Sequence, residues 1–419
     1  MARAAVIGGG LAGLAAAAAL GEAGYGVDVF EARPFLGGRA ASYPIDGEII
    51  DNCQHILLRC CTNLLNFYRR LGVEQCVRFY REYTFIEPGG RASTLRRSLG
   101  SFARLEFLNA REKLAVARAM LALRRERTRR TDLDRISMLD WLLQKRQPAR
   151  AIDRFWRQVL VSALNEDLDR MAARHGFQVF WLGFLASANA YEMGVPTVPL
   201  SDLYDPARWK QAPAIALHTR APVERIEVVD GVVRGLRVAG ETHSADVYVS
   251  AVPFERLSAL APETGIPADL LAYSPITGIH LWFDRPVMNL PHATLLGRTI
   301  QWVFNKHEGR YLLLVVSASR DLLPMSRADV LAIAQYELRE FFPAACEAKL
   351  EKAHVVKEAR ATFSAAPNTE ALRPGPQSAV RNLFLAGDWT RSGWPPTMEG
   401  AVRSGYLAAE AITGRSFCV

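Results

Sequence analysis

Residues 4–13 read Ala-Ala-Val-Ile-Gly-Gly-Gly-Leu-Ala-Gly, and this stretch decides the fold at the start of the chain. Its first four residues predict a short, buried parallel strand, and the alanine-rich residues Leu14 to Ala23 predict a helix. The turn between them carries Gly8, Gly10, Ala12 and Gly13. Glycines at this spacing allow a tight turn and close approach of the backbone to a pyrophosphate, and the start of the helix offers free N–H groups to the anion. The stretch predicts a dinucleotide site, although a plain strand–turn–helix unit could carry the same glycines.

Glu31 supports the dinucleotide interpretation. It stands at the end of a second predicted strand, Val27 to Phe30, and Gly24 ends the helix before that strand. An acidic residue at this place accepts hydrogen bonds from a ribose diol and repels a 2′-phosphate. We therefore expect a Rossmann-like α/β domain at this end of the chain.

A second glycine pair, Gly37-Gly38, is followed by Arg39, whose guanidinium suits bidentate contact with a phosphate. This segment resembles the glycine-doublet extension of flavoproteins in the amine oxidase and phytoene desaturase superfamily. The resemblance implies an FAD cofactor. It also implies cofactor contacts from Ala32, Arg33, Gly38 and Arg39.

Two further motifs near the end of the chain carry the same resemblance. One is an apolar run that closes on Gly387-Asp388, and the other opens a helix at Thr397-Met398. In that superfamily the aspartate holds the ribityl and pyrophosphate region, and the positive end of the helix dipole faces the flavin pyrimidine. By itself, Asp388 would be a turn-forming residue.

The middle of the chain predicts a hairpin from Ala221 to Val233 that turns at Asp230-Gly231, followed by a buried strand from Ala245 to Pro253. By resemblance, the backbone of Val223 contacts the adenine. No second dinucleotide fingerprint occurs in the sequence. The electron donor is therefore expected to be a diffusible molecule or a partner protein, and its identity stays open.

Composition limits the other classes of function. Half of the 419 residues are hydrophobic and the net charge is +8, so a large core is available. Arg96 to Arg130 holds most of the basic excess, and such a local cluster argues against nucleic-acid binding. The six cysteines and eight histidines show no metal-site or disulfide spacing, so we expect no metal and a cytoplasmic protein.

The remaining segments predict a second domain, a mixed sheet with helices, inserted twice into the first. We expect residues 1–74, 205–253 and 380–419 to form the FAD-binding domain. Residues 75–204, read as helices, and 254–379, read as strands with one helix, should form a substrate domain with a hydrophobic tunnel. Asn109 and Ser326 are expected to cap helices that reach about Arg125 and Phe341.

Two helical stretches are candidates for function. Four aromatic residues at helical spacing share one face: Phe177, Phe180, Trp181 and Phe184. They are either core or the lining of a substrate tunnel, where aromatic rings would stabilise a cation. The apolar positions between Asn109 and Arg125 form no single stripe. The basic cluster around them, which includes Arg97, is either a solvated face or a contact with lipid headgroups on the inner face of the cell membrane.

The segment Asp51 to Leu65, with Asp51-Asn52-Cys53-Gln54-His55 at its start, resembles the hydroxysqualene dehydroxylase family, which are squalene-associated flavin enzymes of hopanoid pathways. The likeness covers the whole chain, but Cys53 stands where we expect glycine. It implies reduction of a C30 isoprenoid, an allylic alcohol, to squalene.

That reaction needs an acid for the departing hydroxyl and an apolar pocket that excludes water. Asp51 and His55 are the candidate acid and its orienting partner, and the alternative is that both have structural roles.

Three other functions stay open. A carotenoid desaturase would remove hydride from a polyene with the same fold and cofactor. An amine oxidase would need an amine-oriented site, which the sequence does not demand. A non-catalytic isoprenoid carrier would hold flavin only for structure, and its flavin spectrum would not respond to substrate.

Overall fold

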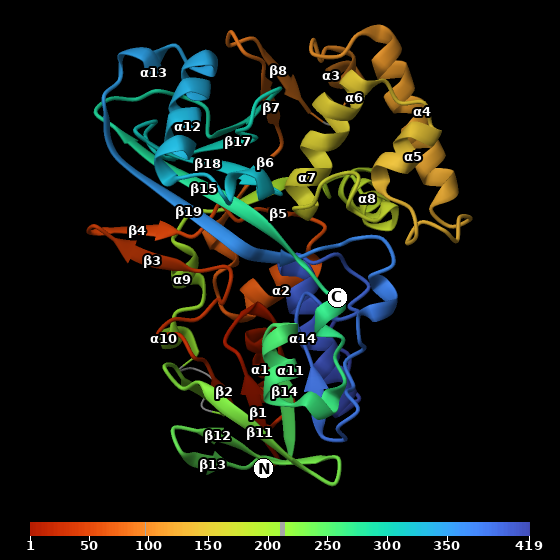
Figure 1. The fold of residues 1–419 in the computed structure, drawn as a ribbon, viewed down its shortest axis with the longest axis vertical. Coiled ribbons are helices and arrows are strands. Elements are labelled where there is room, and N and C mark those ends of the chain that lie inside the picture. The colour runs from red at the N-terminus through yellow and green to blue at the C-terminus, as the bar shows by residue number, and fades with distance from the viewer. Residues whose placement is uncertain (97, 210–213) are drawn as a thin grey trace. The chain divides into compact units, whose positions relative to one another are not determined.

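The computed structural model describes residues 1–96, 98–209 and 214–419 (Figure 1). The chain forms two compact units. Unit 1 comprises Met1–Arg78, Gly194–Ala272 and Thr369–Val419, and unit 2 comprises Phe79–Met193 and Tyr273–Asn368. The assignment of a cofactor domain and a substrate domain, with the boundaries given above, stays a prediction.

Unit 1 is built on a parallel five-stranded sheet, so the predicted Rossmann-like α/β fold is confirmed. In spatial order its strands are β10 (Ile215–His218), β2 (Gly26–Phe30), β1 (Arg3–Ile7), β14 (Val247–Ser250) and β20 (Leu383–Leu385). The central strand β1 is buried from Ala4 to Ile7 because it has a neighbour on each side and helices nearby.

Two helices pack against each other in unit 1, α1 (Leu11–Glu22) and α14 (Met398–Thr413), and they lie side by side in Figure 1. Helix α1 begins three residues earlier than the sequence indicated. A Cβ atom on Gly405 of α14 would lie 2.2 Å from the carbonyl oxygen of Ala12, so only glycine permits this approach. The two helices touch backbone to backbone at this point.

The predicted hairpin is confirmed as β11 (Val223–Val229) and β12 (Val232–Val238), with Asp230 and Gly231 both at positive φ in the turn. The other elements of unit 1 and its borders are short. They are β3 (Ser42–Ile45), β4 (Glu48–Asp51), β5 (Leu57–Leu58), α2 (Thr62–Arg70), β6 (Val77–Tyr80), β9 (Met193–Pro196), α9 (Leu200–Leu203), α10 (Pro206–Trp209), β13 (Glu241–His243) and α11 (Phe254–Leu260).

Unit 2 contains a seven-stranded sheet in which only β16 and β7 pair in parallel. In spatial order its strands are β19 (Leu350–Phe363), β15 (Tyr273–Phe283), β18 (Tyr311–Ser317), β17 (Trp302–His307), β16 (His292–Leu295), β7 (Tyr83–Ile86) and β8 (Ala92–Leu95). The reading of residues 75–204 as helices alone was therefore wrong. Tyr83-Thr84-Phe85-Ile86 is rich in aromatic and β-branched residues and extends the sheet.

Helices cover the rest of unit 2. Helix α12 (Arg327–Phe341) packs on one face of the sheet and starts at the predicted cap, Ser326, whose side chain accepts from Asp329 N. The others are α3 (Leu99–Ala103), α4 (Ala110–Glu126), α5 (Met138–Gln144), α6 (Ala149–Ala151), α7 (Gln158–Leu164), α8 (Ala173–Phe180) and α13 (Ala344–Glu347). The predicted cap at Asn109 is confirmed as a capping box with Glu112. Within the described parts of the chain, no helix has the length and apolar character needed to cross a membrane.

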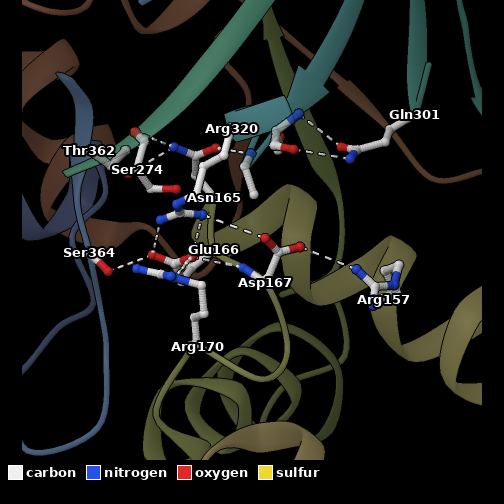
Figure 2. Close-up of polar contacts among 12 residues, drawn as sticks. Arg157, Asn165, Glu166, Asp167, Arg170, Ser274, Gln301, Arg320, Thr362 and Ser364 are labelled. Carbon is white, nitrogen blue, oxygen red and sulfur yellow. Dashed lines mark hydrogen bonds and ion pairs between the residues drawn. The ribbon is translucent and has the colours of Figure 1, made fainter. Parts of the chain in front are cut away.

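A buried polar cluster joins the helices of unit 2 to its sheet (Figure 2). Asn165 ends α7 in the left-handed conformation, and its amide donates to Ser274 O at 3.0 Å and Thr362 Oγ1 at 2.9 Å. Glu166 next to it is fully buried, and its carboxylate pairs with Arg320 at 2.7 Å. A buried charge needs such partners, because they replace the hydrogen bonds to water that the charged group loses on burial.

We expect Gly405→Ala to destabilise the protein by about 1–3 kcal/mol, because its new Cβ atom would overlap the backbone of α1. Gly100→Ala is the control, since Gly100 lies in α3 with open space where its Cβ would be. Denaturant unfolding measures both. If the two variants were equally stable, the helix contact would be looser than the structure shows.

Candidate functional site

The turn before α1 has the geometry of a phosphate-binding loop. Gly8 has a φ of +105°, and its N–H donates to Phe30 O at 2.8 Å. A Cβ atom on Gly13 would lie 1.9 Å from the Gly8 carbonyl oxygen. Both positions therefore require glycine, for the conformation at Gly8 and for the space at Gly13.

The start of α1 keeps donors available. Gly10 is the N-cap, and no side chain of the described residues caps the helix there. The first bond of the helix runs from Leu14 N to Gly10 O, so the N–H groups of Leu11, Ala12 and Gly13 precede it. An uncapped helix start of this kind fits an anionic group such as a pyrophosphate.

Glu31 is held rigidly at the end of β2. The residue is 8% exposed, and its two carboxylate oxygens accept from Gly9 N at 2.7 Å and from Arg33 N at 2.8 Å. A carboxylate fixed by two backbone donors retains acceptor capacity for a ribose hydroxyl. The residue fits its predicted role at the adenosine end.

The glycine doublet lies against this turn. Gly37 N donates to Gly9 O at 2.9 Å, and a Cβ atom on Gly38 would lie 3.0 Å from the Gly10 Cα. Arg33 Nη1 donates to the Gly38 carbonyl at 3.1 Å, which fixes the doublet, whereas Ala32 is exposed. The two glycine motifs form one backbone cradle, as a cofactor site that spans both requires.

The Gly387-Asp388 motif lies next to the glycine doublet, because Asp388 forms an ion pair with Arg39. Gly387 has a φ of +139°, and its N–H donates to Ser404 Oγ of α14 at 2.8 Å. No motif in the sequence indicated a role for Arg373, which is 1% exposed. Its guanidinium donates to the carbonyls of Asp388, Thr390 and Trp394 and so holds the loop before α14.

Helix α14 begins at Met398, and Thr397 caps it by accepting from Gly400 N at 3.3 Å. Glu399 in its first turn is almost fully buried. Its carboxylate accepts from Asn63 Nδ2 and from Leu64 N, each at 2.7 Å, at the start of α2. Burial raises the pKa of this carboxyl. Glu399 was not among the predicted site residues, although it is an acidic residue beside the predicted helix start at Thr397-Met398.

Val223 lies at the start of β11 and is buried, and its carbonyl accepts from Arg256 at 3.1 Å. It belongs to unit 1, as do all the other predicted cofactor residues. Its predicted backbone contact with adenine stays a prediction.

The segment after the doublet is fixed beside Arg39, since Asn52 Nδ2 donates to the Arg39 carbonyl at 2.9 Å. Asp51 is buried, and its Oδ1 accepts from Ser42 Oγ at 2.7 Å and from Leu200 N at 3.0 Å. The His55 ring nitrogen Nδ1 lies 3.0 Å from the Cys53 carbonyl. The φ of Cys53 is not in the left-handed region, so this position does not require the expected glycine.

The four aromatic residues proposed for a tunnel do not share one α-helical face. The helix changes at Trp181 to a π-helical turn, Trp181–Leu185, which shifts the later side chains. Phe177 and Phe180 are core residues that pack on Trp141 and Trp156, with ring centroids 4.8 and 4.7 Å apart. Trp181 instead lies 3.7 Å beneath the guanidinium of Arg127, and Phe184 packs at the edge of the core. A tunnel role for any of them stays a prediction.

A cavity of about 810 Å³ opens beside the polar cluster of Figure 2 in unit 2. Charged side chains dominate its wall, among them Asp153, Arg157, Asp167, Arg170, Arg298 and Arg320. Burial raises the pKa of Asp167 in this wall. Such a wall does not suit a hydrocarbon chain, because an apolar ligand would desolvate the charges without replacing their hydrogen bonds.

Comparison with known proteins identifies the family. Residues 11–413 match the model of the flavin-containing amine oxidoreductases. The chain belongs to this family. The family implies a flavin, and the uncapped start of α1, the glycine cradle and Glu31 fit FAD. The protein is an FAD-dependent oxidoreductase.

Relatives within the wider family differ in substrate. The chain is 27% identical to the 15-cis-phytoene desaturase of Synechococcus elongatus, over 99% of this chain and 96% of that protein. It is 28% identical to the hydroxysqualene dehydroxylase of Zymomonas mobilis, over 98% and 99%. Among solved structures, putrescine oxidase bound to putrescine has a TM-score of 0.76 at 18% identity, with 99% of each chain covered. That last likeness concerns the fold alone.

We expect Glu31→Lys to abolish FAD binding, because it replaces a buried acceptor with a cation among backbone donors. The ratio of flavin absorbance to protein absorbance after purification measures the loss. Glu263→Lys, at an exposed position of the same unit, is the control. A Glu31→Lys protein that purifies fully yellow would contradict this placement of the adenosine.

Proposed function

We propose that the protein reductively removes the hydroxyl group of hydroxysqualene to give squalene. The observation that supports this most is the Asp51–His55 segment, which resembles the hydroxysqualene dehydroxylases and is tied to Arg39 of the cofactor cradle through Asn52. Bound FAD in its reduced form would supply the hydride. The electron donor that reduces it is an external molecule.

His55 is the candidate acid in this proposal. A carbonyl only accepts hydrogen bonds, so His55 Nδ1 carries the proton in its contact with Cys53. The second ring nitrogen, Nε2, is then the atom that gains and gives a proton. Protonation of the departing oxygen matters because hydroxide is a poor leaving group.

Asp51 suits a positioning role better than that of an acid. Ser42 Oγ and Leu200 N both donate to its Oδ1, so these contacts hold the carboxyl group in place. Its substitution should therefore have a smaller effect than that of His55.

A carotenoid desaturase is the second candidate, since relatives of that function match this chain at almost the same identity over its whole length. The two reactions use the flavin in opposite directions. A desaturase takes hydride from a polyene, whereas a dehydroxylase gives hydride to the carbon that loses oxygen. Substrate tests can therefore separate them.

We expect anaerobic, photoreduced protein to be reoxidised by hydroxysqualene with formation of squalene, and phytoene to leave it reduced. Flavin absorbance after rapid mixing follows the reaction, and extraction identifies the product. Reduction of the oxidised protein by phytoene, with no reaction of hydroxysqualene, would favour the desaturase and overturn the proposal.

His55→Ala should retain FAD but slow this reoxidation about 10²- to 10⁴-fold, as expected for a lost general acid. Asp51→Asn should slow it less. If both variants react at the wild-type rate, the acid lies elsewhere in the protein.

We also propose that the protein binds peripherally to the cytoplasmic face of the membrane, where such a substrate dissolves. The apolar residues of helix α4 form no single stripe because they lie on two different sides of the helix. Val116, Ala119 and Leu123 face the core, whereas Leu114 and Leu121 are 51% and 56% exposed. Exposed basic residues surround these two leucines, namely Arg111, Arg118, Arg124 and Arg125. Arg97, also in this basic cluster, lies outside the described residues.

Vesicles of anionic lipid should carry the protein in flotation at low salt and release most of it in 1 M salt, where the Debye length is about 3 Å. Leu114→Asp combined with Leu121→Asp should weaken flotation, and Leu270→Asp, at a 64% exposed position in unit 1, should not. Absence of flotation at low salt would contradict membrane attachment.

A further inference from the structure

The seven-stranded sheet of unit 2 has two different faces. Side chains alternate along a strand, so Ala293 and Leu295 of β16 point to one face and His292 and Thr294 to the other. The first pair packs in the aliphatic core with residues of α12. The second pair lies among aromatic rings, and we call this the aromatic face.

Strand register defines the aromatic face as two adjacent rows, since residues directly opposite in an antiparallel pair share a face. The first row is His292, Phe304, Leu313 and His280. The second row is Thr294, Trp302, Val315 and Gly278. None of these eight positions carries an Asp, Glu, Lys or Arg. Such a surface suits a neutral, largely apolar ligand.

The rings of this face are held in place. Trp302 and Phe304 stack with centroids 5.6 Å apart, and Tyr80 meets His292 edge-on at 4.9 Å. Trp302 Nε1 donates to Ser162 Oγ of α7 at 2.7 Å, which fixes the orientation of the indole. The polar atom of the indole is therefore satisfied within the protein.

Two buried polar atoms beside these rings differ from Trp302 Nε1 in their hydrogen bonding. Among the described residues, nothing hydrogen-bonds to His292 Nδ1 or to Thr294 Oγ1, although the residues are only 3% and 0% exposed. Burial lowers the pKa of His292 to about 4, so the ring is neutral at physiological pH. Unpaired buried polar groups are destabilising, and a ligand hydroxyl group placed between these two would complete both of them.

We infer that His292 and Thr294 bind the hydroxyl group of a long apolar alcohol whose hydrocarbon chain lies against Trp302 and Phe304. One hydroxyl matches both atoms. It accepts from the Thr294 hydroxyl and donates to Nδ1 of the neutral imidazole, which gives each of these two buried atoms a partner. An amine would arrive as a cation, and neither row offers it a carboxylate. Naming the alcohol as hydroxysqualene rests on the proposed function.

The sheet provides a matched control for Thr294. Thr277 of β15 is also fully buried, but its Oγ1 donates to Ser319 Oγ at 2.9 Å. Replacing threonine by valine keeps the shape and exchanges only the hydroxyl group for a methyl group. Thr294→Val should raise the Tm of the unliganded holoenzyme because it removes an unpaired group, whereas Thr277→Val should lower it.

Binding gives the second measurement, made with oxidised holoenzyme so that no reduction occurs. Radiolabelled hydroxysqualene and squalene differ by the hydroxyl group, and the wild type should bind the alcohol more tightly. Thr294→Val should weaken binding of the alcohol about 3- to 10-fold and leave squalene binding unchanged, as for one lost hydrogen bond. Thr294→Ser should restore the preference, Thr277→Val should keep it, and His292→Phe should reduce it like Thr294→Val.

The outcomes separate this inference from the proposed function. If reduced enzyme converts hydroxysqualene but Thr294→Val keeps the full preference for the alcohol, the inference is wrong and the function stands. A fall in Tm for Thr294→Val as large as that for Thr277→Val would also overturn it, because the hydroxyl would then be satisfied without ligand. If no conversion occurs but the preference exists and Thr294→Val loses it, the site stands and another apolar alcohol is the substrate.

Discussion

The first turn of α1 is the place on which the rest of unit 1 depends. Here the backbone of α14, the glycine doublet and the end of β2 all approach within contact distance, through Gly405, Gly38 and Glu31. A side chain at the glycine positions would overlap backbone atoms, which cannot move aside as the end of a flexible side chain can. The cradle exists only because its two glycine motifs meet there, and Gly405 allows α14 to approach α1 beside them.

Buried carboxylates connect elements that are far apart in sequence. Glu31 accepts from Gly9, Glu399 of α14 accepts from the start of α2, and Glu166 pairs with Arg320 in unit 2 (Figure 2). Each is stable in the interior because backbone or guanidinium donors replace its hydration. This need for donors also fixes the relative positions of the connected elements, since a shift of any partner would leave a buried carboxylate without its hydrogen bond.

The two faces of the sheet in unit 2 differ in chemistry. Aliphatic residues on one face pack with α12 and form a core that satisfies itself. Within the part of the chain that the structure describes, the aromatic face holds two buried polar atoms without a hydrogen-bond partner, His292 Nδ1 and Thr294 Oγ1, and such atoms are destabilising in the absence of a ligand. Proteins accept such a cost where function requires it, because an active site is selected for binding and not for stability.

The sequence by itself determined the α/β fold of unit 1, the turn at Gly8 to Gly13, the hairpin at Asp230 and the helix caps at Asn109 and Ser326. These features depend on residues close together in the chain, where glycine conformation, capping and side-chain alternation act locally. Only the tertiary structure decided that Tyr83 to Ile86 extends a sheet and that the leucines of α4 face two ways. It also brought Arg373 to the loop before α14, and it left His292 Nδ1 and Thr294 Oγ1 without a hydrogen-bond partner among the described residues. Those features depend on which distant segments become neighbours, and no local pattern records whether a buried polar atom finds a partner there.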